Sequence, residues 1–261
     1  IAAGIDALQD AGIPLVRRYK ETTTGSKLPT GWSLPEEMWD DTGVIFGSAF
    51  PGYDQLIQIM EEYHEDRSRR VRLEELKALQ FVVVDGPGKS QLAWRIAQLE
   101  EELGEKPYQF DRRFLFQVLN MGHSQFAEYI GARGPNTGIN GACATGTQAV
   151  AMAQDWVQNG RCRRVLVVTG DDVNTENMFP WVASGFVAAG VAATDAKVED
   201  AALPFDRRRH GLIMGMGGSA LVVEDVAAAA ERGVAPICEI LGSVVANSAF
   251  HGSRLDVPHI V

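Results

Sequence analysis

The residues around Cys143 suit nucleophilic catalysis. This cysteine lies in the small-residue segment NGACATG (residues 140–146), directly before an expected helix. A thiol at a helix N-terminus feels the positive end of the helix dipole, which favours the reactive thiolate. Free backbone N–H groups in the first helical turn can stabilise the oxyanion on an attacked carbonyl. The segment therefore predicts a nucleophile turn, although Thr145 stands where G-x-S-x-G has its last glycine.

A structural cysteine in a close-packed strand-to-helix turn is the alternative interpretation, and residue pattern alone favours it. The other two cysteines, Cys162 and Cys238, are interpreted as structural because neither has a turn of small residues built around it. Three cysteines without a C-x-x-C pair predict neither a disulfide framework nor a zinc site. No metal ligands are therefore expected.

Composition limits the classes of partner. The chain has 261 residues and a formal net charge of -10, and this acidic excess argues against a nucleic-acid binder. No apolar stretch approaches the roughly 20 residues that span a bilayer, so no membrane partner is expected. Residues 1–10 lack the basic and apolar regions of a signal peptide. These features predict a cytoplasmic protein.

The elements around Cys143 form a recognisable unit. A strand over residues 137–140 leads through the Cys143 turn into a helix that ends near Asn159, with Gly160 as a left-handed cap. The run RVLVVT (164–169) is apolar on both faces, as in a buried strand. Strand, helix and strand make a βαβ unit, which predicts the α/β class.

The remaining segments are assigned from their periodicity and breakers. Residues 17–42 carry Thr, Gly and Pro and are predicted to be loop. Residues 81–84 look strand-like in a stretch that otherwise favours helix. Strands are expected at 43–48, 219–223 and 237–245, and helices at 5–11, 53–72, 91–103 and 112–130, the last interrupted near residues 121–122.

Two blocks resemble one enzyme family. Residues 134–172 (GPNTGINGACATGTQAVAMAQDWVQNGRCRRVLVVTGDD) are similar to the active-site segment of β-ketoacyl synthases, and residues 204–224 (PFDRRRHGLIMGMGGSALVVE) resemble that family's downstream Pro-Phe-Asp block. Residues 17–41 resemble insertions in multidomain fatty-acid, polyketide and polyunsaturated-fatty-acid synthases. The resemblance implies a thiolase-like layered αβαβα fold, here incomplete. Residues 42–224 would form the N-terminal half and residues 236–261 the start of the C-terminal half of a single ketosynthase domain fragment.

The resemblance also implies a reaction. Cys143 would accept an acyl group from the phosphopantetheine of an acyl carrier protein, and the intact enzyme would condense it with a malonyl thioester and release carbon dioxide. No cofactor is implied. In the family two histidines of the C-terminal half support decarboxylation, and none of the five histidines here lies in either motif. The chain is thus expected to be a middle slice of the domain and to be inactive in condensation unless the remaining segments are supplied.

Further roles follow from matched positions. Phe186 resembles residues that line the acyl pocket, with an ordinary core aromatic as the equal alternative, and His251 matches a position near the pocket entrance. Arg207 to Arg209 are interpreted as ion-paired with Asp206 rather than as carrier contacts. A homodimer is implied, with residues 164–169 as the edge strand. A thiolase-type enzyme without decarboxylation and a silent structural partner remain the alternatives.

Overall fold

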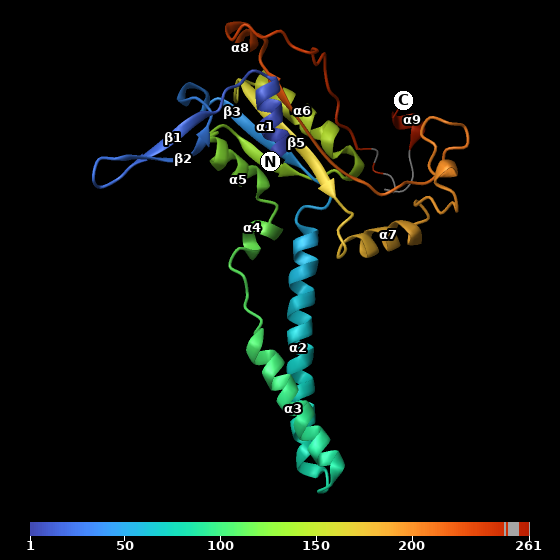
Figure 1. Cartoon of the computed structure of the whole chain (residues 1–261). Coiled ribbons are helices and arrows are strands. Elements are labelled where there is room, and N and C mark those ends of the chain that lie inside the picture. The colour runs from blue at the N-terminus through green and yellow to red at the C-terminus, as the bar shows by residue number, and fades with distance from the viewer. Residues whose placement is uncertain (248, 250–255, 261) are drawn as a thin grey trace. The chain divides into compact units, whose positions relative to one another are not determined.

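The computed structural model describes residues 1–247, 249 and 256–260. The chain divides into two compact units. The first consists of Ile1–Pro51, Asn120–Asp172 and Met216–Val261, and the second of Gly52–Leu119 and Val173–Gly215. Figure 1 labels most of the helices and strands of both units.

A four-stranded sheet organises the first unit, in the order β4-β3-β5-β6. Strands β3 (Thr42–Gly47), β4 (Asn136–Ile139) and β5 (Arg164–Asp172) are parallel, and β6 (Met216–Glu224) pairs with β5 in the antiparallel sense. The predicted strands at 43–48, 137–140, 164–169 and 219–223 are therefore confirmed. Parallel strands joined through helices establish the α/β class.

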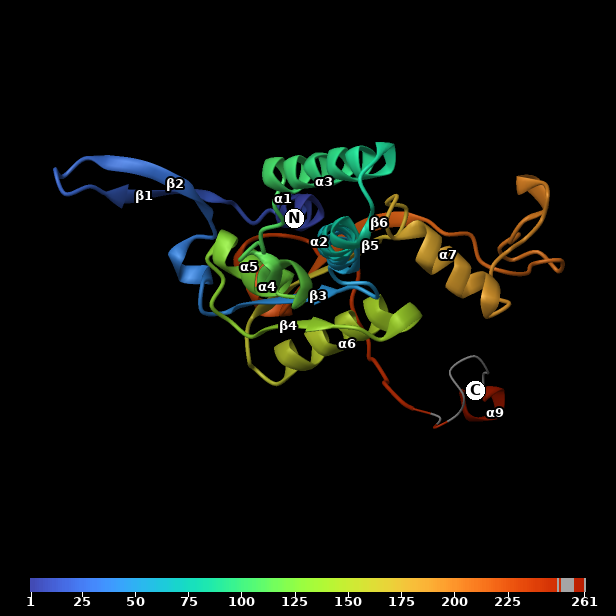
Figure 2. The same cartoon turned by 90° about the horizontal axis from the view of Figure 1, so that it is seen from below.

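Helices cover both faces of this sheet. Helices α1 (Ala2–Asp10) and α5 (Gly122–Ile130) pack on one face with Val44, Leu166 and Val168. Helix α6 (Thr145–Gln158) packs on the other face with Ile45, Val165 and Val167. Successive residues of β3 and β5 thus alternate between two apolar cores, which explains why these strands are apolar throughout. Figure 2 shows α6 across the sheet from α1.

The prediction of loop at 17–42 is wrong. This segment forms an antiparallel hairpin of β1 (Val16–Glu21) and β2 (Lys27–Ser33), followed by the 3-10 turn Glu36–Met38. The turn closes through Thr22, whose N–H donates to Ser26 O and whose Oγ1 accepts from Ser26 N. Arg17 stacks over the Trp32 ring at 5.6 Å. Cross-strand contacts of this kind hold a hairpin that has little buried apolar surface.

The expectation that residues 164–169 form a sheet edge is also wrong. β5 lies between β3 and β6, and β6 pairs with it from Arg164↔Glu224 to Asp172↔Met216. Both hydrogen-bonding sides of β5 are therefore occupied, and the edges of this sheet are β4 and β6.

The start of the expected C-terminal half contains one further correction. Helix α8 (Val226–Glu231) follows β6, and the Asp225 side chain caps its N-terminus. Residues 237–245 form no strand within the part of the chain described, and Ile237, Leu241 and Val244 are exposed. A strand needs a neighbour for its backbone groups, and none of the described strands pairs with this segment. Helix α9 (Val257–Ile260) ends the described chain.

A helical hairpin forms much of the second unit. Helices α2 (Tyr53–Val82) and α3 (Pro87–Glu105) pack through Leu73, Ile96 and Leu99, and Lys77 Nζ lies 2.9 Å from Glu100 Oε1. Helix α2 continues through Val82, so the strand-like appearance of residues 81–84 is misleading. The helix expected at 112–130 is divided into α4 (Phe114–Val118) and α5 by residues 119–121. This break confirms the predicted interruption.

The second unit also contains α7 (Phe179–Ala188) and the 3-10 turn Val198–Asp200. Isolated bridges join Ala192 to Leu212 and Ala202 to His210. Among the described residues, no helix combines the length and apolarity needed to cross a membrane.

Candidate active site

Cys143 lies on a tight turn at the carboxyl edge of the sheet. Strand β4 ends at Ile139, the 3-10 turn Ala142–Ala144 follows, and α6 begins at Thr145. The cysteine is exposed, and its thiol has no hydrogen-bond partner among the residues that the structure describes. A thiol held on a turn at this edge of an α/β sheet is open to a substrate, because ligands bind outside the carboxyl ends of such strands.

The backbone conformation makes this turn sharp. Ala142, directly before the cysteine, has φ 50° and so occupies the left-handed region. For a residue with a Cβ atom this conformation costs about 1 kcal/mol and persists only where surrounding contacts enforce it. Strain of this kind next to a candidate nucleophile is a feature of active-site turns.

Thr145 supplies two of the contacts that hold the turn. Its Oγ1 accepts a hydrogen bond from Gly141 N at 2.9 Å and donates to Ala142 O at 2.6 Å. The side chain is buried, and its methyl group lies against Gly47 at the end of β3. Thr145 therefore bonds to the turn on one side and packs against the sheet on the other.

Most N–H groups of the turn are already used. Ala142 N donates to Asn140 Oδ1 at 3.0 Å, Ala144 N to Gly141 O at 3.1 Å, and Thr145 N to Ala142 O. The N–H of Cys143 itself has no acceptor among the described residues. Among the N–H groups of residues 141–145, that of Cys143 is therefore the one left for a substrate oxygen in the described structure.

The Gln148 side chain fills the space beside Gly141. A Cβ atom at this position would overlap the carboxamide of Gln148, one helical turn into α6. Gln148 therefore occupies the space where a larger residue before the nucleophile would extend. The absence of a side chain at Gly141 is compensated by this contact from the helix.

The other two cysteines differ from Cys143 in their surroundings. Cys162 is buried in the core beneath α6, and desolvation raises the pKa of its thiol to about 11. Its interpretation as a structural residue agrees with this burial. Cys238 is exposed in the irregular segment after α8.

The structure leaves the positions of Phe186 and His251 relative to Cys143 as predictions. Phe186 is a half-buried residue of α7 in the second unit, whereas Cys143 belongs to the first. His251 lies outside the described residues. The roles of Phe186 and His251 in an acyl pocket stay predictions.

The arginine cluster of the second unit is partly paired. Arg208 Nη2 lies 3.0 Å from Asp206 Oδ2, and Arg209 Nη1 donates to Asp206 O. The ion-pair interpretation is thus confirmed for Arg208. His210 Nδ1 donates a hydrogen bond to Arg208 O at 2.9 Å, its Nε2 lies 2.6 Å from Asp195 Oδ2, and these contacts raise the pKa of the imidazole.

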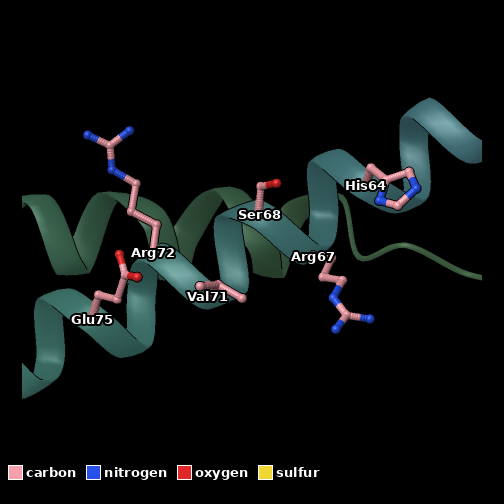
Figure 3. Close-up of a pocket in the computed structure, with 6 residues that line it drawn as sticks. All are labelled: His64, Arg67, Ser68, Val71, Arg72 and Glu75. Atoms are coloured by element: carbon pink, nitrogen blue, oxygen red, sulfur yellow. The ribbon is translucent and has the colours of Figure 1, made fainter.

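A shallow hollow of about 420 Å³ lies along α2, and none of its lining residues is a predicted site residue. Its lining residues are His64, Arg67, Ser68, Val71, Arg72 and Glu75. Figure 3 shows that these side chains diverge from the helix in different directions. Side chains that do not converge cannot enclose a ligand, so this hollow lacks the features of a ligand-binding site.

Sequence reasoning missed the residues that shape the Cys143 turn. Asn140 and Thr145 could have been found, because Asn and Thr side chains commonly bond nearby backbone groups in turns. Asp171 could not. Its contacts are with Ser48, Ala49 and Phe50, which are remote in sequence.

Comparison with known proteins agrees with this architecture. Residues 3–229 match the model of the β-ketoacyl synthase N-terminal domain. A solved complex of a type II polyketide acyl-carrier protein with its ketosynthase aligns with a TM-score of 0.53 at 17% identity, covering 89% of this chain and 44% of that one. This likeness supports the predicted thiolase-like fold.

Curated relatives match over a shorter stretch. The chain is 33% identical over 134 residues to 3-oxoacyl-[acyl-carrier-protein] synthase 2 of Staphylococcus aureus, covering 51% of this chain and 32% of the relative. It is 34% identical over 135 residues to a putative polyketide β-ketoacyl synthase 1 of Streptomyces halstedii, covering 51% and 31%. The matched stretch is about a third of each relative. With most of its length matching the family's N-terminal domain, the chain belongs to the β-ketoacyl synthase family.

Proposed function

We propose that Cys143 is the acyl-accepting nucleophile of a β-ketoacyl synthase. The observation that carries the proposal is the exposed thiol on a strained turn between β4 and α6, in a chain of this family. The acyl donor is a thioester on the phosphopantetheine of an acyl carrier protein. The names of the relatives support this substrate class, because they include a 3-oxoacyl-[acyl-carrier-protein] synthase and a putative polyketide β-ketoacyl synthase.

The first half-reaction is a thioester exchange. The Cys143 thiolate attacks the acyl carbonyl carbon and forms a tetrahedral intermediate with a negative oxygen. The carbon–sulfur bond to phosphopantetheine then breaks as the carbonyl reforms. The phosphopantetheine thiolate leaves and takes up the proton that the Cys143 thiol lost, so atoms and charge balance.

The backbone N–H of Cys143 is the proposed donor to the negative oxygen. It is the N–H of the turn without an acceptor among the described residues, and it is held by the same turn as the attacking sulfur. A donor fixed in this way needs no reorganisation when charge develops on the carbonyl oxygen. The left-handed Ala142 before it sets the direction of this peptide group.

The second half-reaction is a decarboxylative condensation in the intact enzyme. The malonyl thioester loses carbon dioxide, and the resulting carbanion attacks the acyl-Cys143 carbonyl to give a β-ketoacyl thioester and the free thiol. The resemblance assigns decarboxylation to histidines in motifs that this sequence does not contain. We therefore assign this step to no described residue.

Partners and setting are proposed on the same basis. An acyl carrier protein is the expected partner, since the structurally similar ketosynthase was solved in complex with one. Homodimerisation and the absence of a cofactor follow from the family resemblance, and a cytoplasmic setting follows from the composition and cysteine content. None of them enters the argument for Cys143.

Release of thiol tests the first half-reaction. The chain is incubated with an acyl-phosphopantetheine thioester, and the freed thiol is measured against Cys143→Ala and Cys238→Ala. Stoichiometric release that disappears only in Cys143→Ala supports the proposal. Release that persists in Cys143→Ala, or that disappears in Cys238→Ala, contradicts it.

A further inference from the structure

We infer that Asp171 is a positioning residue for the Cys143 turn, acting through the loop after β3 and through Asn140. The catalytic consequence rests on the proposed function, whereas the positioning itself does not. Asp171 lies near the end of β5, and the residues it acts through belong to the same unit as the cysteine.

The carboxylate of Asp171 accepts hydrogen bonds from the loop that follows β3. Its Oδ1 accepts hydrogen bonds from Ser48 Oγ at 2.5 Å and from Phe50 N at 2.9 Å, and its Oδ2 accepts from Ala49 N at 3.0 Å. Three donors on one half-buried carboxylate fix both the position and the rotation of this group. Hydrogen bonds to an ionised acceptor are about twice as strong as neutral ones.

Asn140 connects this loop to the nucleophile turn by hydrogen bonds. Its Nδ2 donates to Ala49 O at 2.9 Å, the carbonyl of a residue whose N–H is held by Asp171. Its Oδ1 accepts from Ala142 N at 3.0 Å. Asn140 thus uses both ends of its amide, and the amide can bridge the two backbones in one orientation only.

This series of hydrogen bonds ends at Ala142, the strained residue beside the nucleophile. Ala142 has φ 50°, so its conformation depends on contacts with neighbouring residues. One of these is the hydrogen bond that its N–H donates to Asn140 Oδ1, and another is the bond that its carbonyl accepts from Thr145 Oγ1. Loosening the loop at Ala49 would therefore release Ala142 toward unstrained conformations and change the direction of the Cys143 N–H.

A carboxylate suits position 171 because both of its oxygens accept hydrogen bonds. An amide in its place would offer one acceptor oxygen and one donor nitrogen, and the nitrogen would face an N–H donor. Asp171→Asn therefore keeps the shape of the side chain while removing at least one of the three bonds. Asn140→Ala interrupts the same series of hydrogen bonds at its other end and provides an independent variant.

Amide exchange tests the positioning without any reaction. Hydrogen exchange at the Ala142 N–H is measured in the full chain, in Asp171→Asn and in Asn140→Ala, with Asp155→Asn, an exposed carboxylate of α6, as the matched control. We expect exchange at Ala142 to rise by about tenfold in the first two variants and to stay unchanged in the control. Unchanged exchange in Asp171→Asn overturns the inference, even if Asn140→Ala responds.

The catalytic consequence is tested by comparing two reactions of the same thiol. Acyl transfer from an acyl-phosphopantetheine thioester requires the oriented N–H, whereas alkylation by iodoacetamide forms no oxyanion. We expect acyl transfer to fall by about tenfold in both variants, with alkylation within about twofold of the parent chain.

The two variants should also be non-additive. Because Asp171 and Asn140 act through the same series of hydrogen bonds, acyl transfer in the double variant should be no slower than in the slower single variant. Equal losses in acyl transfer and alkylation indicate a general structural role and overturn the inference. A parent chain that accepts no acyl group, with the exchange result intact, counts against the proposed function and leaves the positioning established.

Discussion

Arg164 and Glu224 face each other across β5 and β6 and form a buried ion pair. Arg164 begins β5 and pairs with Glu224, which ends the antiparallel β6, and Arg164 Nε lies 2.8 Å from Glu224 Oε1. Arg164 Nη1 also reaches Asp41 Oδ1 at 2.8 Å, and Arg232 Nη2 reaches Glu224 Oε2 at 2.7 Å. This network joins β5 and β6 to the residue before β3 at the end of the sheet opposite the Cys143 turn.

Removing Arg164 should strongly destabilise the first unit. Its side chain is 4% exposed, so Arg164→Ala leaves Glu224 buried with only Arg232 as a partner. Breaking a buried pair in this way costs about 3–5 kcal/mol. Chemical denaturation measures the loss. The neighbouring Arg163→Ala is the control, because its pair with Glu231 is exposed and should contribute at most about 1 kcal/mol. Similar losses for both variants would contradict this account.

Glu224 should make stability depend on acid pH. Desolvation alone would raise the pKa of this carboxyl, but hydrogen bonds from Arg232 and Arg164 outweigh it and lower the pKa below its ordinary value. A lowered folded pKa adds stability above the unfolded pKa, and that stability is lost as pH falls through the folded value. Denaturation at several pH values below 5 should show this decline. The decline should be shallower in Glu224→Gln and unchanged in Glu231→Gln; an equally steep decline in Glu224→Gln would disprove the assignment.

Cys162 should resist thiol reagents in the folded chain. Burial raises the pKa of its thiol to about 11, and the side chain lies in the core beneath α6. At pH 8 roughly one such thiol in a thousand would be ionised. Mass-resolved labelling should therefore modify the exposed Cys143 and Cys238 first and Cys162 only in denaturant. Labelling of Cys162 at the rate of Cys238 would show that the core in the structure is wrong.

Gly47 should tolerate no side chain, because it separates the end of β3 from the nucleophile turn. A Cβ atom there would lie 2.7 Å from Thr145 Cγ2 and 3.0 Å from Thr169 Cγ2. Overpacking of this kind costs about 1–3 kcal/mol, and the displaced Thr145 would disturb its two bonds to the turn. Unfolding and acyl transfer are measured together for Gly47→Ala. Gly31→Ala, which meets open space, should change the free energy of unfolding by at most about 0.5 kcal/mol.

The sequence predicts the central elements well because their signals are local. The apolar run at 164–169, the small residues around Cys143 and Gly160 at φ 67° each carry their structural reason in their own segment. The β1–β2 hairpin was missed because its cross-strand contacts, such as Arg17 on Trp32, have no periodic apolar pattern. The strand expected at 237–245 fails for the opposite reason. It has the pattern but no pairing strand in the described structure.

The residues of the candidate site likewise differ in whether the local sequence could predict them. Cys143 becomes the candidate nucleophile through the family resemblance of its segment, and Thr145 and Asn140 act over a few residues. The Asp171 contacts depend on β3 and β5 lying side by side, a relationship between segments more than a hundred residues apart, with Ser48 and Asp171 separated by 123 positions. Only the folded sheet brings these groups together.

Locating the acyl group tests the central claim most directly. The chain is incubated with an acyl-phosphopantetheine thioester, digested, and mapped by mass spectrometry across its three cysteines. The account predicts one acyl group on the peptide that contains Cys143, none on Cys162 or Cys238, and no adduct in Cys143→Ala. An acyl group on Cys238 with an unmodified Cys143 would contradict it.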